Sequence, residues 1–509
     1  MIIKKMRIAV LCLVGIILQP VALVTAQETA VLEGGSADGL KVGIFAIGLD
    51  TYWDQFEGLK ENLLGYHKTI CDGLEGLGAE VVDAGLVDHP SKAAAAASLF
   101  RQSEVEMIFL YVSTYALSST VLPVVRDVGV PVVVLSLQPV AQLDYESFNA
   151  LGDRGLMTGR WLEHCQACSV PEIASVFNRA GIPYEIVTGF LDDQEAWAEI
   201  EEWVQAGRVV HAMRQNRMGV LGHYYQGMLD VYSDMTLLTT TFGTHFELLE
   251  MCELKALRDG VEEDRVQAKL EEFQAQFAVS PECEPSELRR AALTSCALDA
   301  LVAKRELGSM AYYYEGQPGN DYEDIVTSII AGNTLLTGRN VPVAGECEIK
   351  NAHAMKILDL LGAGGSFSEF YLTDFVEDLV FLGHDGPAHF AIAEGPVGLV
   401  PLPVFHGKPG KGLSIQMSVQ NGPVTLLSVV HNPGGTISLL VAEGESVPGP
   451  VLQIGNTNSR YQFPISAKDF VNSWAYAGPA HHCAIGVGHW AEVLRKVGGL
   501  LGIDVLIVC

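Results

Sequence analysis

Short apolar runs rich in β-branched residues alternate with amphipathic stretches from Lys41 onward, and this alternation limits the possible folds more than any other feature. Such an order is typical of βαβ units, and therefore of a doubly wound parallel sheet with helices on both faces. Strands are expected at Val42–Ile47, Val81–Val82, Met107–Val112 and Val130–Leu135, with helical segments around 92–103 and 117–128. No G-x-G-x-x-G follows the first strand, so a dinucleotide site is not expected there.

The chain has 509 residues, which is more than one hydrophobic core usually serves. A second α/β segment follows the first, with a strand expected at Met235–Thr241 and a charged helix around Glu262–Phe277. After Gly362 apolar and polar residues alternate and turns are frequent, which favours antiparallel strands. We expect two Rossmann-like α/β domains and then a β-rich, barrel-like domain, with boundaries at 38–211, 212–362 and 363–509.

Residues 1–26 have the order of a secretory signal peptide. Basic residues come first, an apolar run from Ile8 to Val24 follows, and the segment ends in small residues at Ala26. A retained membrane anchor is the rival interpretation, although Gly15 and Pro20 interrupt the run. A real leader predicts a periplasmic or secreted protein, whereas a start assigned too far upstream would leave a cytoplasmic one.

Acidic residues outnumber basic ones by 61 to 32, and without residues 1–26 the balance becomes 61 to 29. A field of this sign repels nucleic-acid phosphates and anionic lipids, whereas a neutral small molecule is indifferent to it. The ten cysteines are scattered and do not form a disulfide framework. Cys165 and Cys168 form a C-x-x-C pair, but no second pair at zinc spacing follows, so ordinary thiols near a helix end are the simpler interpretation.

Four residues beside glycines or other small residues are of the types that bind metals: Glu346, Glu369, His384 and His482. Two carboxylates and two imidazoles suit manganese, cobalt or a similar divalent ion, whereas calcium prefers oxygen ligands alone. The absence of thiolate from the set disfavours structural zinc. The four residues are far apart in the chain, so their spacing matches no local metal motif and each also has an ordinary structural explanation.

Several segments resemble the L-arabinose and L-fucose isomerase family, and L-arabinose isomerases most closely. In the first domain these are Tyr111–Ser118 and Gly129–Leu135. In the second half the matching segments are Ala344–Glu346, Gly365–Glu369, Leu382–His384 and Trp474–His482, in the family's order and at similar separations. The resemblance extends over nearly all of the chain after residue 40, and it is close only in these blocks.

The resemblance implies a metal-dependent aldose–ketose isomerase. It would place Glu346, Glu369, His384 and His482 around a manganese ion, with the two glutamates as acid and base. It also implies a homo-oligomer, trimeric or hexameric, acting on a small sugar without a nucleotide cofactor. Such a reaction moves protons between adjacent sugar carbons through a cis-enediol, which two carboxylates can share. A cation stabilises the negative charge that develops on the sugar oxygens.

Other residues near these motifs have weaker claims. His481 is expected to pack beside His482, and Glu348 and His389 are minor competitors for the ligand roles. Tyr312 falls near a position where the family presents an aromatic ring to substrate, although a tyrosine in a core strand is an equal explanation. In the stretch where the family has a sugar-facing histidine, this chain reads Asn149–Gly155. The departure affects sugar recognition more than metal binding.

Three function classes follow from these observations. The leading hypothesis is an isomerase of L-arabinose or a close relative such as L-fucose or D-galactose. The alternative is a secreted sugar-binding or sensing protein that keeps the fold without turnover. A metal-dependent hydrolase has little support, because the sequence has neither a nucleophile elbow nor a zincin helix motif.

Overall fold

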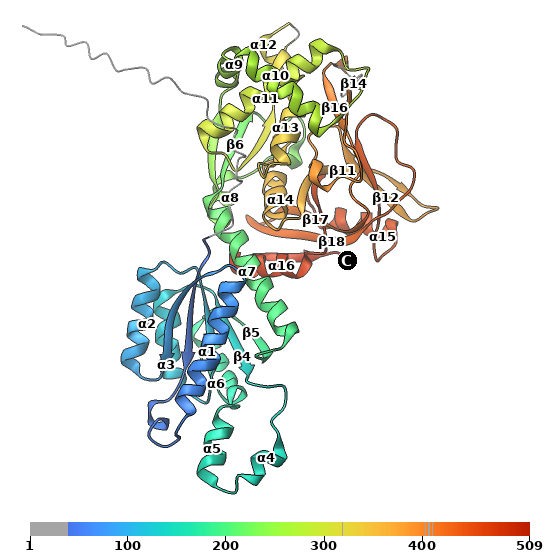
Figure 1. The fold of residues 1–509 in the computed structure, drawn as a ribbon. Coiled ribbons are helices and arrows are strands. Elements are labelled where there is room, and N and C mark those ends of the chain that lie inside the picture. Colours follow the sequence, from blue (N-terminus) through green and yellow to red (C-terminus); the bar gives the residue numbers. More distant parts are fainter. Residues whose placement is uncertain (1–38, 318, 403, 406–407, 410) are drawn as a thin grey trace, which may run out of the picture. The chain divides into compact units, whose positions relative to one another are not determined.

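The computed structural model describes residues 39–317, 319–402, 404–405, 408–409 and 411–509 (Figure 1). The predicted leader at residues 1–26 lies outside this part and stays a prediction. No helix within the described part of the chain combines the length and the apolar character needed to cross a bilayer.

The first sheet is parallel, and the prediction of a doubly wound α/β fold is confirmed for it. Its strand order is β2-β1-β3-β4-β5. The strands are β1 (Lys41–Ile47), β2 (Glu80–Val87), β3 (Met107–Tyr111), β4 (Val132–Gln138) and β5 (Tyr184–Phe190). The helices are α1 (Leu59–Gly76), α2 (Pro90–Gln102), α3 (Ser118–Val128), α4 (Tyr145–Ala150), α5 (Arg154–Leu162), α6 (Gln166–Ala180) and α7 (Gln194–Gln215).

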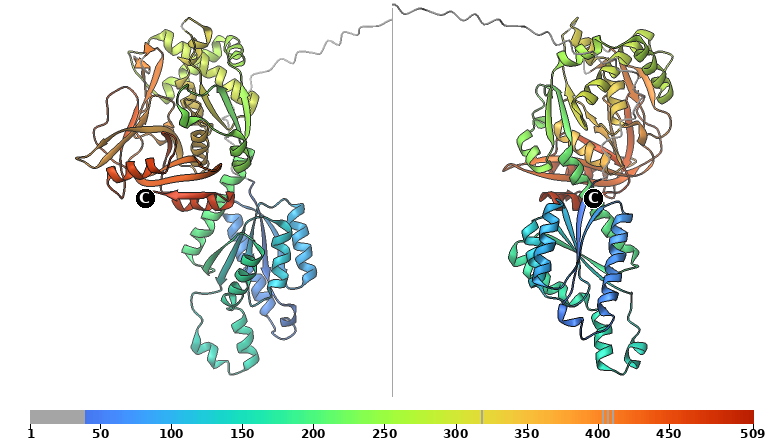
Figure 2. Two further views of the ribbon diagram at one scale, coloured as in Figure 1. Left: turned by 180° about the vertical axis from the view of Figure 1, so that it is seen from behind. Right: turned by 60° about the vertical axis from the view of Figure 1, so that its left-hand side comes forward.

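Helices cover both faces of this sheet, as the two views in Figure 2 show. On one face α1 and α7 pack against alternate strand residues such as Ile44 and Phe109. On the other face α2, α3 and α6 pack against the residues between them, such as Phe45 and Ile108. The inner strands β1, β3 and β4 are therefore apolar on both sides, which explains their continuous apolar runs in the sequence.

A second parallel sheet follows, with the order β10-β9-β6-β7. Its strands are β6 (Arg217–Gly222), β7 (His245–Leu249), β9 (Ser309–Tyr313) and β10 (Val343–Ala344). The helices of this region are α8 (Met235–Phe242), α9 (Met251–Asp259), α10 (Glu263–Gln276), α11 (Pro285–Arg305), α12 (Asp321–Val326), α13 (Ile330–Thr337) and α14 (Ile349–Leu360). The charged helix predicted around Glu262–Phe277 is confirmed as α10.

The prediction of a strand at Met235–Thr241 is wrong, because these residues form helix α8. The carboxylate of Asp234 caps the helix by accepting a hydrogen bond from the backbone N–H of Leu237. Leu238 and Phe242, four residues apart, are both fully buried. Capping and the burial of one helix face thus outweigh the strand preference of the threonines in this segment.

The third sheet is mainly antiparallel and closes on itself, which confirms the expected barrel-like region. Six strands pair in the circular order β17-β20-β11-β12-β19-β18, and β18 returns to pair with β17. They are β11 (Gly364–Asp374), β12 (Leu379–His384), β17 (Gly422–Asn432), β18 (Thr436–Ser446), β19 (Thr457–Gln462) and β20 (His482–Val487). β21 (Asp504–Ile507) adds to β18 in parallel. Helices α15 (Ala467–Tyr476) and α16 (Ala491–Leu501) complete the region.

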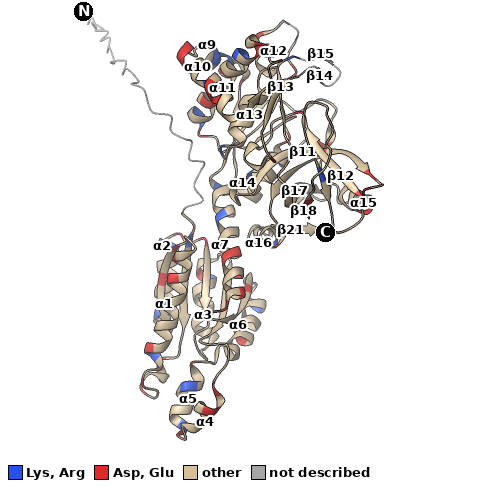
Figure 3. Cartoon of the chain, turned by 45° about the vertical axis from the view of Figure 1, so that its right-hand side comes forward, with Lys and Arg blue, Asp and Glu red and all other residues tan. Residues whose placement is uncertain are grey.

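Smaller elements join these sheets. A three-stranded sheet contains β8 (Ala278–Val279), β13 (Gly398–Pro401) and β16 (Leu413–Gln416), and β14 (Val404–Phe405) pairs with β15 (Lys408–Pro409). Short 3-10 helices lie at Asp50–Tyr52, Leu229–Val231 and Phe390–Ile392. Charged side chains lie mostly on helices and loops (Figure 3). The fold class is as predicted, whereas the domain boundaries at 211 and 362 stay predictions.

Candidate functional site

Glu346 lies in a strained turn at the carboxyl end of β10. Glu346 and the next residue, Cys347, both have positive φ angles, 55° and 58°, which non-glycine residues rarely adopt. Backbone hydrogen bonds hold this conformation: the N–H of Cys347 donates to the carbonyl of Tyr312, and the N–H of Tyr225 donates to that of Glu346. Strained backbone of this kind persists where surrounding structure enforces it, often at functional sites. Only 8% of Glu346 is exposed.

His482 begins strand β20 and is completely buried. Its Nδ1 lies 3.4 Å from Oε2 of Glu348, and its Nε2 lies 3.5 Å from Oε2 of Glu346. A hydrogen bond from Nδ1–H to Glu348 leaves the Nε2 lone pair directed towards Glu346. This tautomer and its carboxylate partner are those of a typical metal-binding histidine.

His481 lies as close to Glu346 as His482 does. Its Nε2 is 3.5 Å from Oε2 of Glu346, and its Nδ1 is 2.6 Å from Oδ2 of Asp230. Burial alone would lower the pKa of His481, but the contacts with Glu346 and Asp230 raise it to about 9. Both ring nitrogens therefore carry a proton at neutral pH in this arrangement, and Nε2 would release its proton on binding a cation. Sequence reasoning expected His481 only to pack, whereas this geometry makes it another candidate ligand.

Polar contacts link these residues into a closed ring. Lys350 lies 2.9 Å from Glu348 and donates a 2.7 Å hydrogen bond to the backbone carbonyl of Asp230. Glu348 contacts His482, and Asp230 contacts His481, so the ring closes through Glu346. Glu348 is completely buried and Lys350 is nearly so. These contacts hold each imidazole at its Nδ1 atom, so the Nε2 atom of each histidine faces Glu346.

The chemistry of this cluster fits a divalent cation. Within the described part of the chain, neither Oε2 of Glu346 nor Nε2 of His482 has a hydrogen-bond partner, and both are buried. An oxygen and a nitrogen lone pair facing each other at 3.5 Å repel unless a positive charge lies between them. One ligand atom each from Glu346, His481 and His482 lies within 4.8 Å of the other two, as shared coordination requires.

His384 also lies near Glu346, at the end of β12. Its Nε2 is 3.9 Å from Oε1 of Glu346, and its Nδ1 accepts a 2.7 Å hydrogen bond from the N–H of Gly386. The Phe367 ring lies 4.4 Å from both the His384 and the His482 ring and packs between them. Three of the four predicted ligands, Glu346, His384 and His482, are thus brought together.

Glu369 lies on the neighbouring strand β11. It is directly opposite His482 in the β11–β20 ladder and opposite Gly383 in the β11–β12 ladder. Residues directly opposite in an antiparallel pair project from the same face of the sheet, with their Cα atoms about 5 Å apart. The backbone of Glu369, the fourth predicted ligand, therefore lies beside the cluster. His389 instead lies beside Asp359, with 3.8 Å between Nε2 and Oδ1.

A pocket of about 540 Å³, counting the open space at its mouth, lies against Glu346 and His384. Its other walls combine Asp385 with aromatic and aliphatic residues: Tyr225, Tyr312, Tyr313, Tyr314, Val326 and Ile330. This mixture of apolar walls with a few polar groups is typical of small-molecule sites. The expected residue Tyr312 is part of it, and burial raises the pKa of its phenol to about 12, so that it stays neutral.

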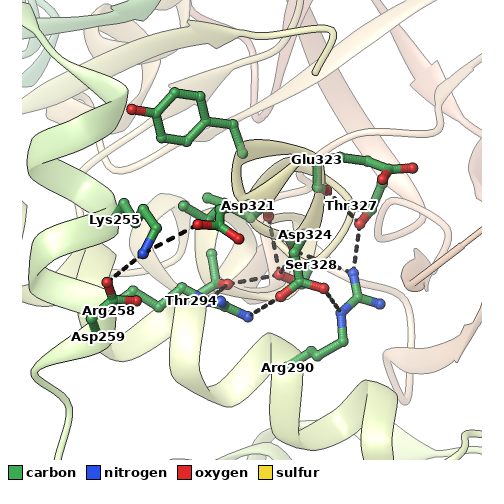
Figure 4. A network of polar contacts seen from close by, with 12 residues as sticks. Lys255, Arg258, Asp259, Arg290, Thr294, Asp321, Glu323, Asp324, Thr327 and Ser328 are labelled. Atoms are coloured by element: carbon green, nitrogen blue, oxygen red, sulfur yellow. Dashed lines mark hydrogen bonds and ion pairs between the residues drawn. The ribbon is translucent and has the colours of Figure 1, made fainter. Parts of the chain in front are cut away.

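One wall of the pocket is held in place by ion pairs. Val326 belongs to α12, and Asp324 on the same helix accepts hydrogen bonds from Arg258 at 2.7 Å and Arg290 at 2.8 Å (Figure 4). Lys255 adds a contact to Asp321 at 3.5 Å. Burial alone would raise the pKa of Asp324, but the two arginines keep it below its usual value, so the clamp stays ionised at neutral pH.

Sequence reasoning missed Asp230 and Lys350 and gave Glu348 little weight. Asp230 is separated from His481 by 251 positions, and no motif surrounds it. Glu348 carried a weak signal, because it is two residues from Glu346 in the same turn. Its complete burial, which only the fold reveals, is what marks it as a partner of His482.

No family model matches the chain. Among curated proteins it is similar to three proteins named L-arabinose isomerase. That of Nocardioides sp. is 24% identical over 354 residues, covering 66% of this chain and 68% of the relative. That of Yersinia enterocolitica is 25% identical over 349 residues, covering 64% and 67%. That of Bacillus subtilis is 20% identical over 360 residues, covering 66% and 69%.

Proposed function

Because the chain is a distant member of the L-arabinose isomerase family, we propose that it interconverts an aldose and its ketose with one divalent cation. The observation that carries the proposal is the buried pair of Glu346 Oε2 and His482 Nε2. These atoms face each other at 3.5 Å without hydrogen-bond partners, beside a pocket lined by Glu346, His384 and four tyrosines. A neutral sugar suits a chain whose net charge is −29.

Glu346 and His482 would hold the cation, with His384 and Glu369 as the further ligands that the family resemblance implies and His481 as a competitor. The oxygen and nitrogen donors suit manganese or cobalt. When bound, the cation supplies positive charge that stabilises the developing enediolate and keeps nearby carboxylates ionised. Glu348 would hold the His482 ring in the tautomer that leaves Nε2 free.

Two carboxylates can carry the proton transfers of the isomerisation. One takes the proton from the carbon next to the carbonyl and a proton is returned to the former carbonyl carbon, while the hydroxyl proton of the first of these carbons passes to the former carbonyl oxygen, so that the reaction passes through a cis-enediol. We assign these roles to Glu346, which lines the pocket, and to Glu369 on β11. The neutral Tyr312 phenol can donate a hydrogen bond to a sugar oxygen.

We propose L-arabinose or a close relative such as L-fucose or D-galactose as the substrate, and a trimeric or hexameric assembly. A ketose assay on a panel of aldoses, with purified protein and added manganese, tests the reaction. At least one aldose should be converted, and Glu346→Gln and Glu369→Gln should each abolish turnover while circular dichroism stays unchanged. If no aldose is converted but a sugar raises the melting temperature, the protein binds sugars without isomerising them. Light scattering on the same sample measures the number of subunits.

A further inference from the structure

A second cluster of metal-binding residue types lies in the first α/β region, on elements that the proposed reaction does not use. His67 and Cys71 belong to α1, and Asp83 belongs to the edge strand β2. One ligand atom from each residue lies within 4.8 Å of those of the other two. His67 and Cys71 are four positions apart, so both side chains project from the same face of the helix towards β2.

The distances within this cluster approach those of a tetrahedral zinc site. The Cys71 sulfur lies 3.5 Å from Nε2 of His67. Zinc–sulfur and zinc–nitrogen bonds of about 2.3 and 2.0 Å, at a tetrahedral angle, place the two ligand atoms about 3.5 Å apart. Oδ1 of Asp83 lies 2.7 Å from the same nitrogen and would need to move by roughly 0.6 Å to reach the tetrahedral spacing. The Asp83 side chain is 47% exposed, so this movement is open to it.

The surroundings favour a cation. His67 is 97% buried, so its ring cannot exchange Asp83 and Cys71 for water. The N–H of Gly85 donates a 2.7 Å hydrogen bond to Oδ1 of Asp83, and this glycine lies in a β-bulge where β2 shifts register against β1. Two further acids, Asp72 and Glu75, lie near the Cys71 sulfur. Lys68 pairs with Asp72 and offsets its charge, so Asp83 and Glu75 provide the negative field around the Cys71 sulfur.

We propose that His67, Cys71 and Asp83 bind one zinc ion, with a water molecule as the fourth ligand, at a site separate from the proposed isomerase centre. Sulfur, nitrogen and oxygen donors together suit zinc, whereas manganese prefers a set without sulfur. Binding replaces the Cys71 S–H bond with a zinc–sulfur bond, and the proton passes to solvent. The ion would tie α1 to β2, an edge strand that pairs with a neighbour on one side only.

Cobalt(II) and zinc titrations of the full chain test this site. Cobalt bound through Cys71 should give an intense thiolate-to-cobalt charge-transfer absorption, and stoichiometric zinc should abolish it. Zinc should also raise the melting temperature of the wild-type protein. Cys71→Ser should remove the absorption, and Asp83→Asn should weaken cobalt binding at least about tenfold. The proposal is overturned if the wild-type protein gives no such absorption, or if the absorption survives in Cys71→Ser.

Two further variants, together with Asp83→Asn, separate this outcome from others. Cys296→Ser removes another buried thiol, one that contacts the carbonyl of Arg265, and should keep the absorption. Glu346→Gln should keep it too, because the proposed isomerase centre contributes no sulfur. Asp83→Asn changes a half-exposed carboxylate and leaves α1 intact, so it remains informative if Cys71→Ser does not fold. Loss of the absorption in Glu346→Gln would assign it to the other cluster and contradict the proposal.

Discussion

The two histidine-containing clusters contain similar residue types but differ in burial and in how their polar atoms are satisfied. Around Glu346 the carboxylate and His482 are buried, and the two atoms that face each other have no hydrogen-bond partners in the described structure. Around His67 the nitrogen already contacts Asp83 at 2.7 Å, and the carboxylate is half-exposed. Nδ1 of His67 also lacks a hydrogen-bond partner in the described structure, but this cluster lies at a sheet edge and lines no described pocket. Buried atoms with unmet polarity beside a pocket are suited to catalysis, whereas a half-exposed carboxylate at a sheet edge is suited to a supporting role.

The largest expected effect comes from Glu346→Gln, which keeps the shape of the side chain but removes its charge. Turnover should fall at least about a thousandfold, because a metal ligand and a proton-transferring group are lost together. Steady-state assays on the best aldose measure it. Glu163→Gln is the matched control, since Glu163 is 95% buried but contacts Arg160 in the first α/β region. Equal losses in both variants would contradict a special role for Glu346.

Chelation should show that turnover depends on the metal of the Glu346 cluster and not on that of the His67 cluster. Removing divalent ions should abolish turnover in the wild-type protein and in Cys71→Ser alike, and manganese should restore both. The restored rates should agree within about twofold, because the His67 cluster does not take part in the reaction. Manganese that restores the wild-type protein but not Cys71→Ser would show that the clusters depend on each other.

A third histidine, His353, offers a test of whether a histidine that is buried without an acidic partner has only a structural role. His353 is fully buried, donates to the carbonyl of Ile349, and stacks on Phe242 with ring centroids 4.9 Å apart. Burial lowers its pKa from 6.5 to about 4. Between pH 6.5 and 4 the unfolded chain therefore binds a proton that the folded chain excludes, and stability falls as pH falls.

When the pH falls, the free energy of unfolding of His353→Leu should decrease by about 3 kcal/mol less than that of the wild-type protein. This value follows because each unit of pKa difference corresponds to about 1.4 kcal/mol. Urea unfolding at pH 7 and pH 4.5 measures it. His245→Gln, with a side chain that is 63% exposed, is the control and should leave the difference between the two pH values unchanged. An unchanged difference in His353→Leu would contradict the assignment.

Glu348→Gln probes the support behind His482. The neutral amide holds the ring less firmly, so the manganese concentration needed for half-maximal activity should rise by about 10- to 100-fold, with most activity recovered at saturating metal. A titration of activity against manganese measures it. Glu348 has no place in the chemical step, so a loss that saturating metal cannot rescue would indicate a catalytic role instead.

Asp324→Asn should have the smallest effect. Weakening the clamp on α12 by about 1 kcal/mol should raise KM about fivefold with little change in kcat, because α12 forms a wall and does not act on the reacting atoms. Glu253→Gln breaks a comparable pair of ion contacts, to Lys304 and Arg305, and should leave KM unchanged. A fall in kcat in Asp324→Asn would place α12 in the reaction itself.

Local patterns predicted the strands and helices well where one period dominated. The apolar runs became β1, β3 and β4, and the charged segment became α10. The error at Met235–Thr241 arose because threonines favour strands locally, whereas the Asp234 cap and the burial of Phe242 favour a helix. The strand preference of threonine can be read from a short stretch of sequence. The burial of Phe242 depends on packing against residues that are distant in the sequence.

The candidate site was predictable only through motif resemblance. Glu346, His384 and His482 come together because β10 and β12 end near the point where β20 begins, which no spacing rule reveals. Asp230 and Lys350 remained hidden because each depends on contacts across more than a hundred positions. The positive φ angles at Glu346 and Cys347 were equally hidden, since neither residue is glycine.

The α12 clamp has a consequence for protein engineering. The centre around Glu346 and the wall that carries Val326 come from separate segments, and the ion pairs of Asp324 attach that wall to α9 and α11. Mutant libraries confined to Tyr314 and Val326 can therefore reshape the pocket lining while the buried Glu346 and His482 keep their positions. Such libraries offer a direct route to variants with altered sugar preference.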